Sequence, residues 1–284
     1  MSGDLHIHTR YSSAPELTPR KVVEDVKNFN KLNIEGIYTI AITDHQNLQG
    51  IQEARIAAGC EIRVIGGIEI KTYLPIVGKC DILGYGVEGK SRISNFVKKL
   101  SSRQLDWSKK ILEKLEASDV QIDRDSLKKQ GLIDERYLSE IIAEAGYANT
   151  WDEAMRKYLD VGRPGYVELK LPSTISVIKM LHENRALPVL AHPIYFGSEM
   201  LNAIEYLTSP GESERIEGIE VYHPAQSNEM RNMLASKAKE RNLLIFGGSD
   251  AHGPGSRYPK SIGEAVLPNK EVEIVIEKLD KNGE

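Results

Sequence analysis

Histidines follow strand-like segments throughout this chain, and this pattern limits the folds that the chain can adopt. The chain opens with Asp4-Leu5-His6-Ile7-His8, whose period-two spacing places both imidazoles on one face of an extended strand. Near the other end, Gly248-Ser249-Asp250-Ala251-His252 follows a short apolar run. Six of the seven histidines occupy such positions: His6, His8, His45, His192, His223 and His252. A fold that gathers the ends of these strands would therefore gather the histidines.

The segments between these strands have the pattern of amphipathic helices. Thr18-Pro19 is a typical helix start, and apolar residues from Val22 to Phe29 recur at helical spacing. Alternation of strands and helices favours βαβ units and a parallel sheet or barrel. In a β/α barrel the C-terminal strand ends form one mouth, where active sites lie. We expect about seven core strands, most of them ending in a side chain that can bind metal.

One part of the chain departs from this alternation. From about residue 89 to residue 163 no strand-like run occurs, and apolar residues such as Ile93, Val97 and Leu100 recur at helical spacing. We interpret residues 89–163 as a small all-helical insertion. It divides the barrel sequence into residues 1–88 and residues 164–284. A chain of 284 residues is long enough for this arrangement.

Composition narrows the class of protein further. A formal net charge of −4 argues against an extended nucleic-acid surface, although a few local basic groups would suffice for a small phosphorylated substrate. Cys60 and Cys80 form neither a disulfide framework nor a metal motif; Cys80, beside Asp81, is only a weak candidate ligand. Without a signal-peptide pattern or 18 consecutive apolar residues, we expect a cytoplasmic protein with no membrane contact. The sequence carries no signal for its oligomeric state.

The residue types at the strand ends indicate a metal site. Three acids, Asp44, Glu69 and Asp250, occupy positions equivalent to those of the histidines. Mixed histidine and carboxylate ligands suit zinc, manganese or iron. Several acids together suit a site with more than one cation, because a carboxylate can bridge two cations and offset their repulsion.

Five short motifs, in this order, resemble those of the PHP (polymerase and histidinol phosphatase) family: 4–9, 41–45, 67–69, 191–193 and 248–252. The resemblance spans residues 4–252. It implies a distorted seven-stranded, TIM-like β/α barrel and a metal-dependent phosphoesterase. It also implies two or three divalent ions, which would be manganese, iron or zinc, with magnesium as an alternative.

The resemblance also implies a ligand set. The first metal would be held by His6, His8, Glu69 and Asp250; the second by Glu69, Asp81 and His192; the third by His45 and His252. Two departures affect it. The family usually has Ser-Asp-Gly after the first motif, whereas residues 12–16 here end in Glu16, which either replaces that aspartate or leaves a weak third site. The family usually has histidine in place of Asp81, and aspartate would favour manganese, iron(II) or magnesium over zinc.

The insertion resembles one branch of the family. Residues 156–159 and 163–167 are similar to enzymes that hydrolyse nucleoside monophosphates and 3′,5′-bisphosphates, some of which trim RNA ends; Tyr137 departs from the histidine usual in that branch. This implies a small nucleotide substrate, with Arg163 and then Arg103 contacting its phosphate. His223 would contact substrate, and His223 or His252 would protonate the leaving oxygen. Asp44 would orient a ligand histidine.

Other functions remain open. A histidinol-phosphate-type phosphatase is a near alternative, but the helical insertion fits it less well. Barrels that hydrolyse amides or esters typically bridge their metals with lysine, and Glu69 stands at that position here. A non-catalytic regulatory PHP module is the alternative outside the enzymes, and the intact ligand set for the first metal argues against it. Read singly, Asp81 and Glu16 could also be solvated surface acids.

Overall fold

The computed structural model describes residues 2–12, 14, 16–87, 91–125, 133–209, 211–253 and 260–283. The chain forms two compact units. One comprises Met1–Ser94 together with Leu171–Glu284, and the other comprises Asn95–Lys170. The predicted insertion, residues 89–163, overlaps most of the second unit. The boundaries at residues 89 and 163 stay predictions.

The first unit is built on a seven-stranded sheet whose strands neighbour one another in chain order. They are β1 (Ser2–Ile7), β2 (Ile37–Ile42), β3 (Arg63–Leu74), β4 (Gly78–Tyr85), β5 (Leu187–Leu190), β6 (Gly218–Tyr222) and β7 (Leu244–Gly247). β4 runs antiparallel to β3 and β5, whereas the other neighbours are parallel. The predicted seven-stranded α/β architecture is confirmed, with one strand reversed.

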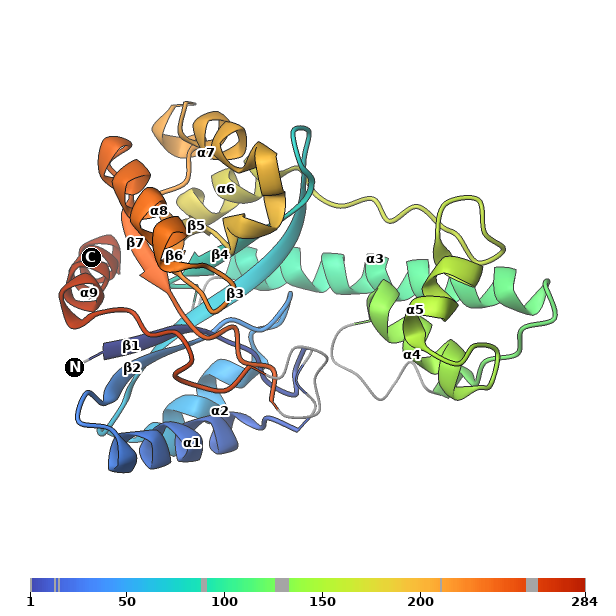
Figure 1. Ribbon diagram of the computed structural model, residues 1–284, viewed down its shortest axis with the longest axis horizontal. Coiled ribbons are helices and arrows are strands. Elements are labelled where there is room, and N and C mark those ends of the chain that lie inside the picture. Colours follow the sequence, from blue (N-terminus) through green and yellow to red (C-terminus); the bar gives the residue numbers. More distant parts are fainter. Residues whose placement is uncertain are drawn as a thin grey trace. The chain divides into compact units, whose positions relative to one another are not determined.

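The sheet curves so that its first and last strands approach each other (Figure 1). A single parallel bridge joins Ile7 to Ala251, and the His8 backbone N–H donates to the Ala251 carbonyl at 3.0 Å. The buried Asp4 carboxylate continues this seam, accepting from the backbone N–H groups of Ser249 at 2.9 Å and Gly263 at 3.1 Å. Burial raises the pKa of Asp4 to about 6. These contacts join β1 to the segment after β7, where a regular barrel would have a continuous ladder of strand hydrogen bonds. The barrel is therefore distorted at this seam.

Helices pack around this sheet as the sequence pattern predicts. They are α1 (Pro19–Leu32), α2 (Gln49–Ala58), α6 (Thr174–Glu183), α7 (Met200–Thr208), α8 (Asn228–Glu240) and α9 (Asn269–Gly283), with short helical turns at Pro193–Glu199 and Glu212–Glu214. Thr18 caps α1 by accepting from the Lys21 N–H, and Val22 and Val26 are buried. α1 and α2 lie side by side (Figure 1).

The interior of the sheet is apolar below the strand ends. Tyr85 and Phe246 stack with ring centroids 4.7 Å apart, and the Tyr85 hydroxyl donates to the Leu5 carbonyl at 2.8 Å. Val272 and Val275 of α9 join the same buried cluster. The filled interior leaves the strand ends as the place where polar side chains gather.

The second unit is helical over its described residues. α3 (Ser91–Glu116) begins in the first unit and continues into the second, which also contains α4 (Glu135–Glu144), α5 (Trp151–Ala154) and a π-helical turn at Met155–Leu159. Its core includes Trp107, whose indole N–H donates to the Val167 carbonyl at 2.8 Å. Among the helices that the structure describes, none is long and apolar enough to cross a bilayer.

Candidate metal centre

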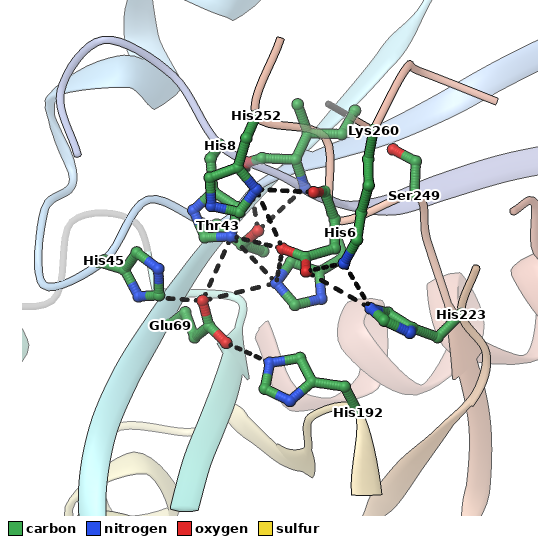
Figure 2. Close-up of polar contacts among 12 residues, drawn as sticks. His6, His8, Thr43, His45, Glu69, His192, His223, Ser249, His252 and Lys260 are labelled. Atoms are coloured by element: carbon green, nitrogen blue, oxygen red, sulfur yellow. Dashed lines mark hydrogen bonds and ion pairs between the residues drawn. The ribbon is translucent and has the colours of Figure 1, made fainter. Parts of the chain in front are cut away.

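Polar side chains from six strands meet at one end of the sheet (Figure 2). They come from the end of β1, the segment after β2, the middle of β3 and the segments after β5, β6 and β7. In that order they are His6 and His8, His45, Glu69, His192, His223, and Asp250 with His252. The strand-end positions predicted from the sequence therefore do converge.

His6, His8 and Asp250 form the centre of this group. The two Nε2 atoms of His6 and His8 are 3.2 Å apart, and Asp250 Oδ1 lies 3.4 Å from the first and 3.1 Å from the second. Glu69 Oε2 lies 3.5 Å from His6 Nε2 and 3.3 Å from His8 Nε2. All four residues are buried. These are the residues predicted to hold the first metal.

Glu69 joins this centre to its other neighbours. Its Oε1 atom contacts His192 Nε2 at 3.0 Å, while Oε2 contacts His45 Nδ1 at 3.0 Å. Ligand atoms of His8, His45 and His252 lie within 4.8 Å of one another, as do those of His6, Glu69 and His192. A carboxylate that faces separate histidines with each oxygen has the position of a ligand bridging two cations.

The donor atoms fit divalent cations. His6 Nδ1 contacts Glu220 Oε1 at 2.9 Å, so the proton of the neutral ring lies on Nδ1 and the Nε2 lone pair faces His8. Glu69 Oε2 is buried without a hydrogen-bond partner, because its contact with His45 Nδ1 lacks hydrogen-bond geometry. Lone pairs and carboxylate oxygens that crowd one buried space repel each other unless a cation lies between them. Metal binding would satisfy these atoms together.

The carboxylates keep their charge despite burial. Burial raises the pKa of Glu69, but the His45 and His6 rings outweigh this effect and hold the pKa well below its ordinary value. Burial also opposes the charge of Asp250, whose pKa His6, His223 and His8 hold well below normal. Both acids are therefore in the ionised form that binds metal.

The histidines fall into two groups. Burial would lower the pKa of His6, but Glu220, Asp250 and Glu69 raise it well above its ordinary value; His192 likewise rises to about 9 beside Glu69. Burial lowers the pKa of His45 well below normal and, together with His8, lowers that of His252 to about 4. His45 and His252 are thus neutral, as metal ligands must be. The raised pKa values of His6 and His192 reflect the carboxylates around them, whose negative charge a bound cation would otherwise offset.

Glu220 contacts two of the candidate ligand histidines. The sequence did not predict Glu220 as a site residue. Its Oε1 atom contacts His6 Nδ1 at 2.9 Å, and Oε2 accepts from the His192 backbone N–H at 2.7 Å. Burial raises the pKa of Glu220, but His6 and His223 lower it overall. The signal in the sequence was an acid in the middle of the otherwise apolar strand Gly218–Tyr222.

Replacing Glu220 with glutamine is expected to weaken metal binding by about tenfold to a hundredfold, because the charged partner of His6 is lost. Metal titration of the stripped protein would measure this change. Glu205→Gln, on the exposed face of α7, is the matched control. An unchanged metal affinity in Glu220→Gln would show that Glu220 does not orient His6.

Asp81 lies at the same end of the sheet through the reversed strand. Its cross-strand partner is Lys71, and its carbonyl accepts from the Ala191 N–H at 3.2 Å, next to His192. Asp81 Oδ1 is buried without a hydrogen-bond partner. Burial and the charge of Glu69 both raise its pKa. Asp81 is near the centre, but it is not part of the group of closely spaced ligand atoms from His6, Glu69 and His192. Its role as a ligand stays a prediction.

Asp44 is buried but serves the adjoining loop. It accepts hydrogen bonds from the Thr9 N–H, the Thr9 hydroxyl and the Ser12 hydroxyl, each at 2.6 Å. Burial raises its pKa. These contacts fix the segment after His8, and the predicted role of Asp44 in orienting a ligand histidine stays a prediction.

Three further predicted site residues are exposed. Glu16 is a solvent-exposed loop residue, and Arg103 and Arg163 are exposed residues of the second unit. Their roles stay predictions. Lys260, which the sequence did not predict, contacts the centre: its Nζ atom lies 2.5 Å from Asp250 Oδ2. No strand-end pattern in the sequence marked Lys260.

Two of the candidate ligands have an unusual backbone. His192 has φ 25° and Asp250 has φ 51°, both in the left-handed region that residues with a Cβ rarely adopt. Each follows the end of a strand at the mouth of the barrel. The chain therefore turns sharply where it presents these side chains.

Comparisons with known proteins show which enzymes the chain resembles. No family model matches the sequence. The chain is 27% identical over 260 residues to a 5′–3′ exoribonuclease of Escherichia coli, covering 88% of this chain and 85% of the relative. It is 25% identical over 260 residues to the 3′,5′-nucleoside bisphosphate phosphatase of Chromobacterium violaceum, covering 89% and 87%. A Bifidobacterium adolescentis protein assigned as a metal-dependent phosphoesterase superposes with a TM-score of 0.76 and 25% identity, over 97% of this chain and 95% of that one.

The chain is similar to PHP-type metal-dependent phosphoesterases in both sequence and fold. Its five motifs thus have a common explanation, and the TIM-like fold expected of a PHP protein is confirmed. A C. violaceum structure described as an amidohydrolase, with bound sulfate and no metal, shares this fold with a TM-score of 0.78 and 23% identity, over 98% and 96% of the two chains.

Proposed function

We propose that this protein hydrolyses a phosphate monoester of a nucleotide, with a nucleoside 3′,5′-bisphosphate or monophosphate as substrate. The observation that carries the proposal is the position of Glu69, whose two oxygens face different histidines inside one buried group. Such a group can hold cations side by side, an arrangement that metal-dependent phosphatases and nucleases use to hydrolyse phosphate esters. The similarity to a 3′,5′-nucleoside bisphosphate phosphatase supports the choice of substrate.

The residues have distinct roles in this proposal. His6, His8, Glu69 and Asp250 would hold a first cation; Glu69 and His192, with Asp81, a second; His45 and His252 a third. When bound, these cations supply hydroxide at neutral pH and neutralise charge on the phosphate.

The remaining site residues would act on the substrate. His223 Nε2, beside Asp250, would donate a proton to the leaving oxygen. Arg163, and after it Arg103, would contact the phosphate.

A second candidate function is 5′–3′ exoribonuclease activity. The exoribonucleases of E. coli and Haemophilus influenzae each match 88% of this chain, and the phosphatase matches 89%. Both candidates act on a phosphate ester of ribose, so the same metal centre would serve either one. The product distinguishes them, since a phosphatase releases inorganic phosphate and an exoribonuclease releases nucleotides.

Metal removal tests the proposal. Protein stripped with EDTA is expected to lose at least about a hundredfold in rate, because the cations supply several kcal/mol of transition-state stabilisation. Reloading with manganese, iron(II), zinc or magnesium should restore it. The substrates are AMP, adenosine 3′,5′-bisphosphate, histidinol phosphate and a short 5′-phosphorylated RNA, assayed for inorganic phosphate and for nucleotides.

The outcomes separate the candidates. Phosphate release from the bisphosphate or AMP supports the proposal, and stepwise nucleotide release from RNA supports the second candidate. Hydrolysis of histidinol phosphate alone would replace both. A reloaded, metal-bound protein that hydrolyses none of the four substrates would contradict an enzymatic role and favour a regulatory module.

A further inference from the structure

Two hydrogen-bond donors converge on one oxygen of Asp250. Lys260 Nζ lies 2.5 Å from Asp250 Oδ2, and His223 Nε2 lies 3.4 Å from the same atom. The two donor atoms are 3.0 Å apart. The Lys260 side chain is 11% exposed and that of His223 is fully buried, so the protein holds both groups in place. Figure 2 shows Lys260 and His223 side by side at the edge of the centre.

The backbone fixes which nitrogen of His223 carries the proton. His223 Nδ1 accepts from the Ala225 N–H at 3.2 Å, so in the neutral ring the proton lies on Nε2. That N–H and the Lys260 ammonium cannot bond to each other, because both are donors. They can share an anionic oxygen, and Asp250 Oδ2 is that oxygen in this structure. Two fixed donors directed at one oxyanion are the arrangement that binds a phosphate or stabilises its charge.

The two oxygens of Asp250 have different neighbours. Oδ1 faces the ring nitrogens of His6 and His8, at 3.4 Å and 3.1 Å, where a cation would bind. Oδ2 faces Lys260 and His223. The two donors therefore lie directly beside the metal ligands, where a phosphate bound to the centre must place its oxygens.

Tyr195 indicates that this side of the centre can be reached by a ligand. Its ring contacts His223 edge-on, with centroids 5.9 Å apart, and lies 5.2 Å from the His192 ring. Tyr195 is nevertheless 58% exposed. The wall of the centre next to His223 thus borders solvent.

We propose that Lys260 is a substrate-binding residue, whose ammonium group binds a non-bridging oxygen of the substrate phosphate while the neighbouring His223 Nε2–H faces the leaving oxygen. This inference rests on the proposed function and adds to it a phosphate contact from the first unit. An ammonium group has three N–H donors, so it can hold Asp250 and a phosphate oxygen at the same time. The contact would select for substrates with a dianionic terminal phosphate over neutral esters.

The test compares Lys260→Met, Lys260→Arg and the control Lys281→Met, whose lysine is 68% exposed on α9. Metal content per chain, the Kd for inorganic phosphate by calorimetry, and kcat and KM for the best substrate are measured for each metal-loaded protein. Lys260→Met should raise the phosphate Kd and KM about tenfold to a hundredfold at unchanged metal content, as expected for a lost hydrogen bond to a charged group. Lys260→Arg should retain most of the phosphate affinity, and Lys281→Met should match the wild type.

An unchanged phosphate Kd in fully metal-loaded Lys260→Met would overturn the inference. A fall in metal content without a change in the phosphate affinity of the loaded fraction would also overturn it, because Lys260 would then only position Asp250. The two proposals fail separately. Wild-type protein that binds phosphate through Lys260 but hydrolyses no phosphoester would refute the proposed function alone.

Discussion

Replacing Glu69 with glutamine is expected to reduce hydrolysis by at least about a thousandfold, because a metal centre supplies several kcal/mol and each 1.36 kcal/mol is worth a factor of ten. Glutamine has the shape of glutamate but lacks the charge that would bridge two cations. In the present structure Glu69 contacts His192 through one oxygen and His45 through the other. The variant should therefore lose metal as well as activity.

Metal analysis and kinetics on the same preparation would check this prediction. Glu61→Gln is the matched control, because Glu61 is 72% exposed and pairs with Lys27 on the surface. Circular dichroism would show whether the Glu69 variant is folded. A folded Glu69→Gln protein with full metal content and a rate within tenfold of the wild type would rule out the bridging role.

Replacing Gly248 with alanine is expected to destabilise the protein by about 3 kcal/mol, at the upper end of the usual cost of overpacking. A Cβ atom at this position would lie 2.2 Å from the His6 backbone nitrogen and 2.8 Å from Asp4 Oδ1. The obstacle is backbone, so no rotamer change can remove it. β1 and the Asp250 segment would have to separate along the seam that Asp4 and Ala251 form.

Chemical denaturation would measure the loss of stability, and a metal titration would show the expected loss of affinity as His6 and Asp250 move apart. Gly211→Ala is the control, since a Cβ atom there would meet no neighbour within 4 Å. It should change stability by no more than about 0.5 kcal/mol. Equal stability of the two variants would mean that close packing at Gly248 does not hold the barrel closed.

The sequence predicted the centre well where position along a strand determines position in space. His6 and His8 share a face because strand side chains alternate, and Asp250 and His192 follow strands whose C-terminal ends meet at one end of the sheet. The first of these placements is local and the second follows from parallel strand topology, so both can be inferred from the sequence alone. The reversed direction of β4 was not predicted; it follows from the three residues, 75–77, that join β3 to β4, since so short a connection allows only antiparallel pairing.

The residues that support the centre were harder to predict. Glu220 is identified as a site residue only by its contact with His6, which is 214 positions away in sequence. Lys260 contacts Asp250 only through the tertiary fold. The hydrogen bonds of Asp44 to Thr9 and Ser12 were not predicted either, because they depend on how the segment after His8 folds back. Side-chain pairing across the fold is not encoded in a local pattern.

The left-handed backbone at His192 and Asp250 lowers the stability of the fold, while the side chains at these two positions are candidate metal ligands. This conformation costs a residue with a Cβ roughly 1–2 kcal/mol, and glycine would adopt it without that cost. Glycine has no side chain to offer to a cation, so selection for stability alone and selection for activity favour different residues at both positions. The strain lies beside Gly248, where the chain already has no room for a side chain. Relatives that no longer need the centre would be free to lose these two residues first and would become more stable by losing them.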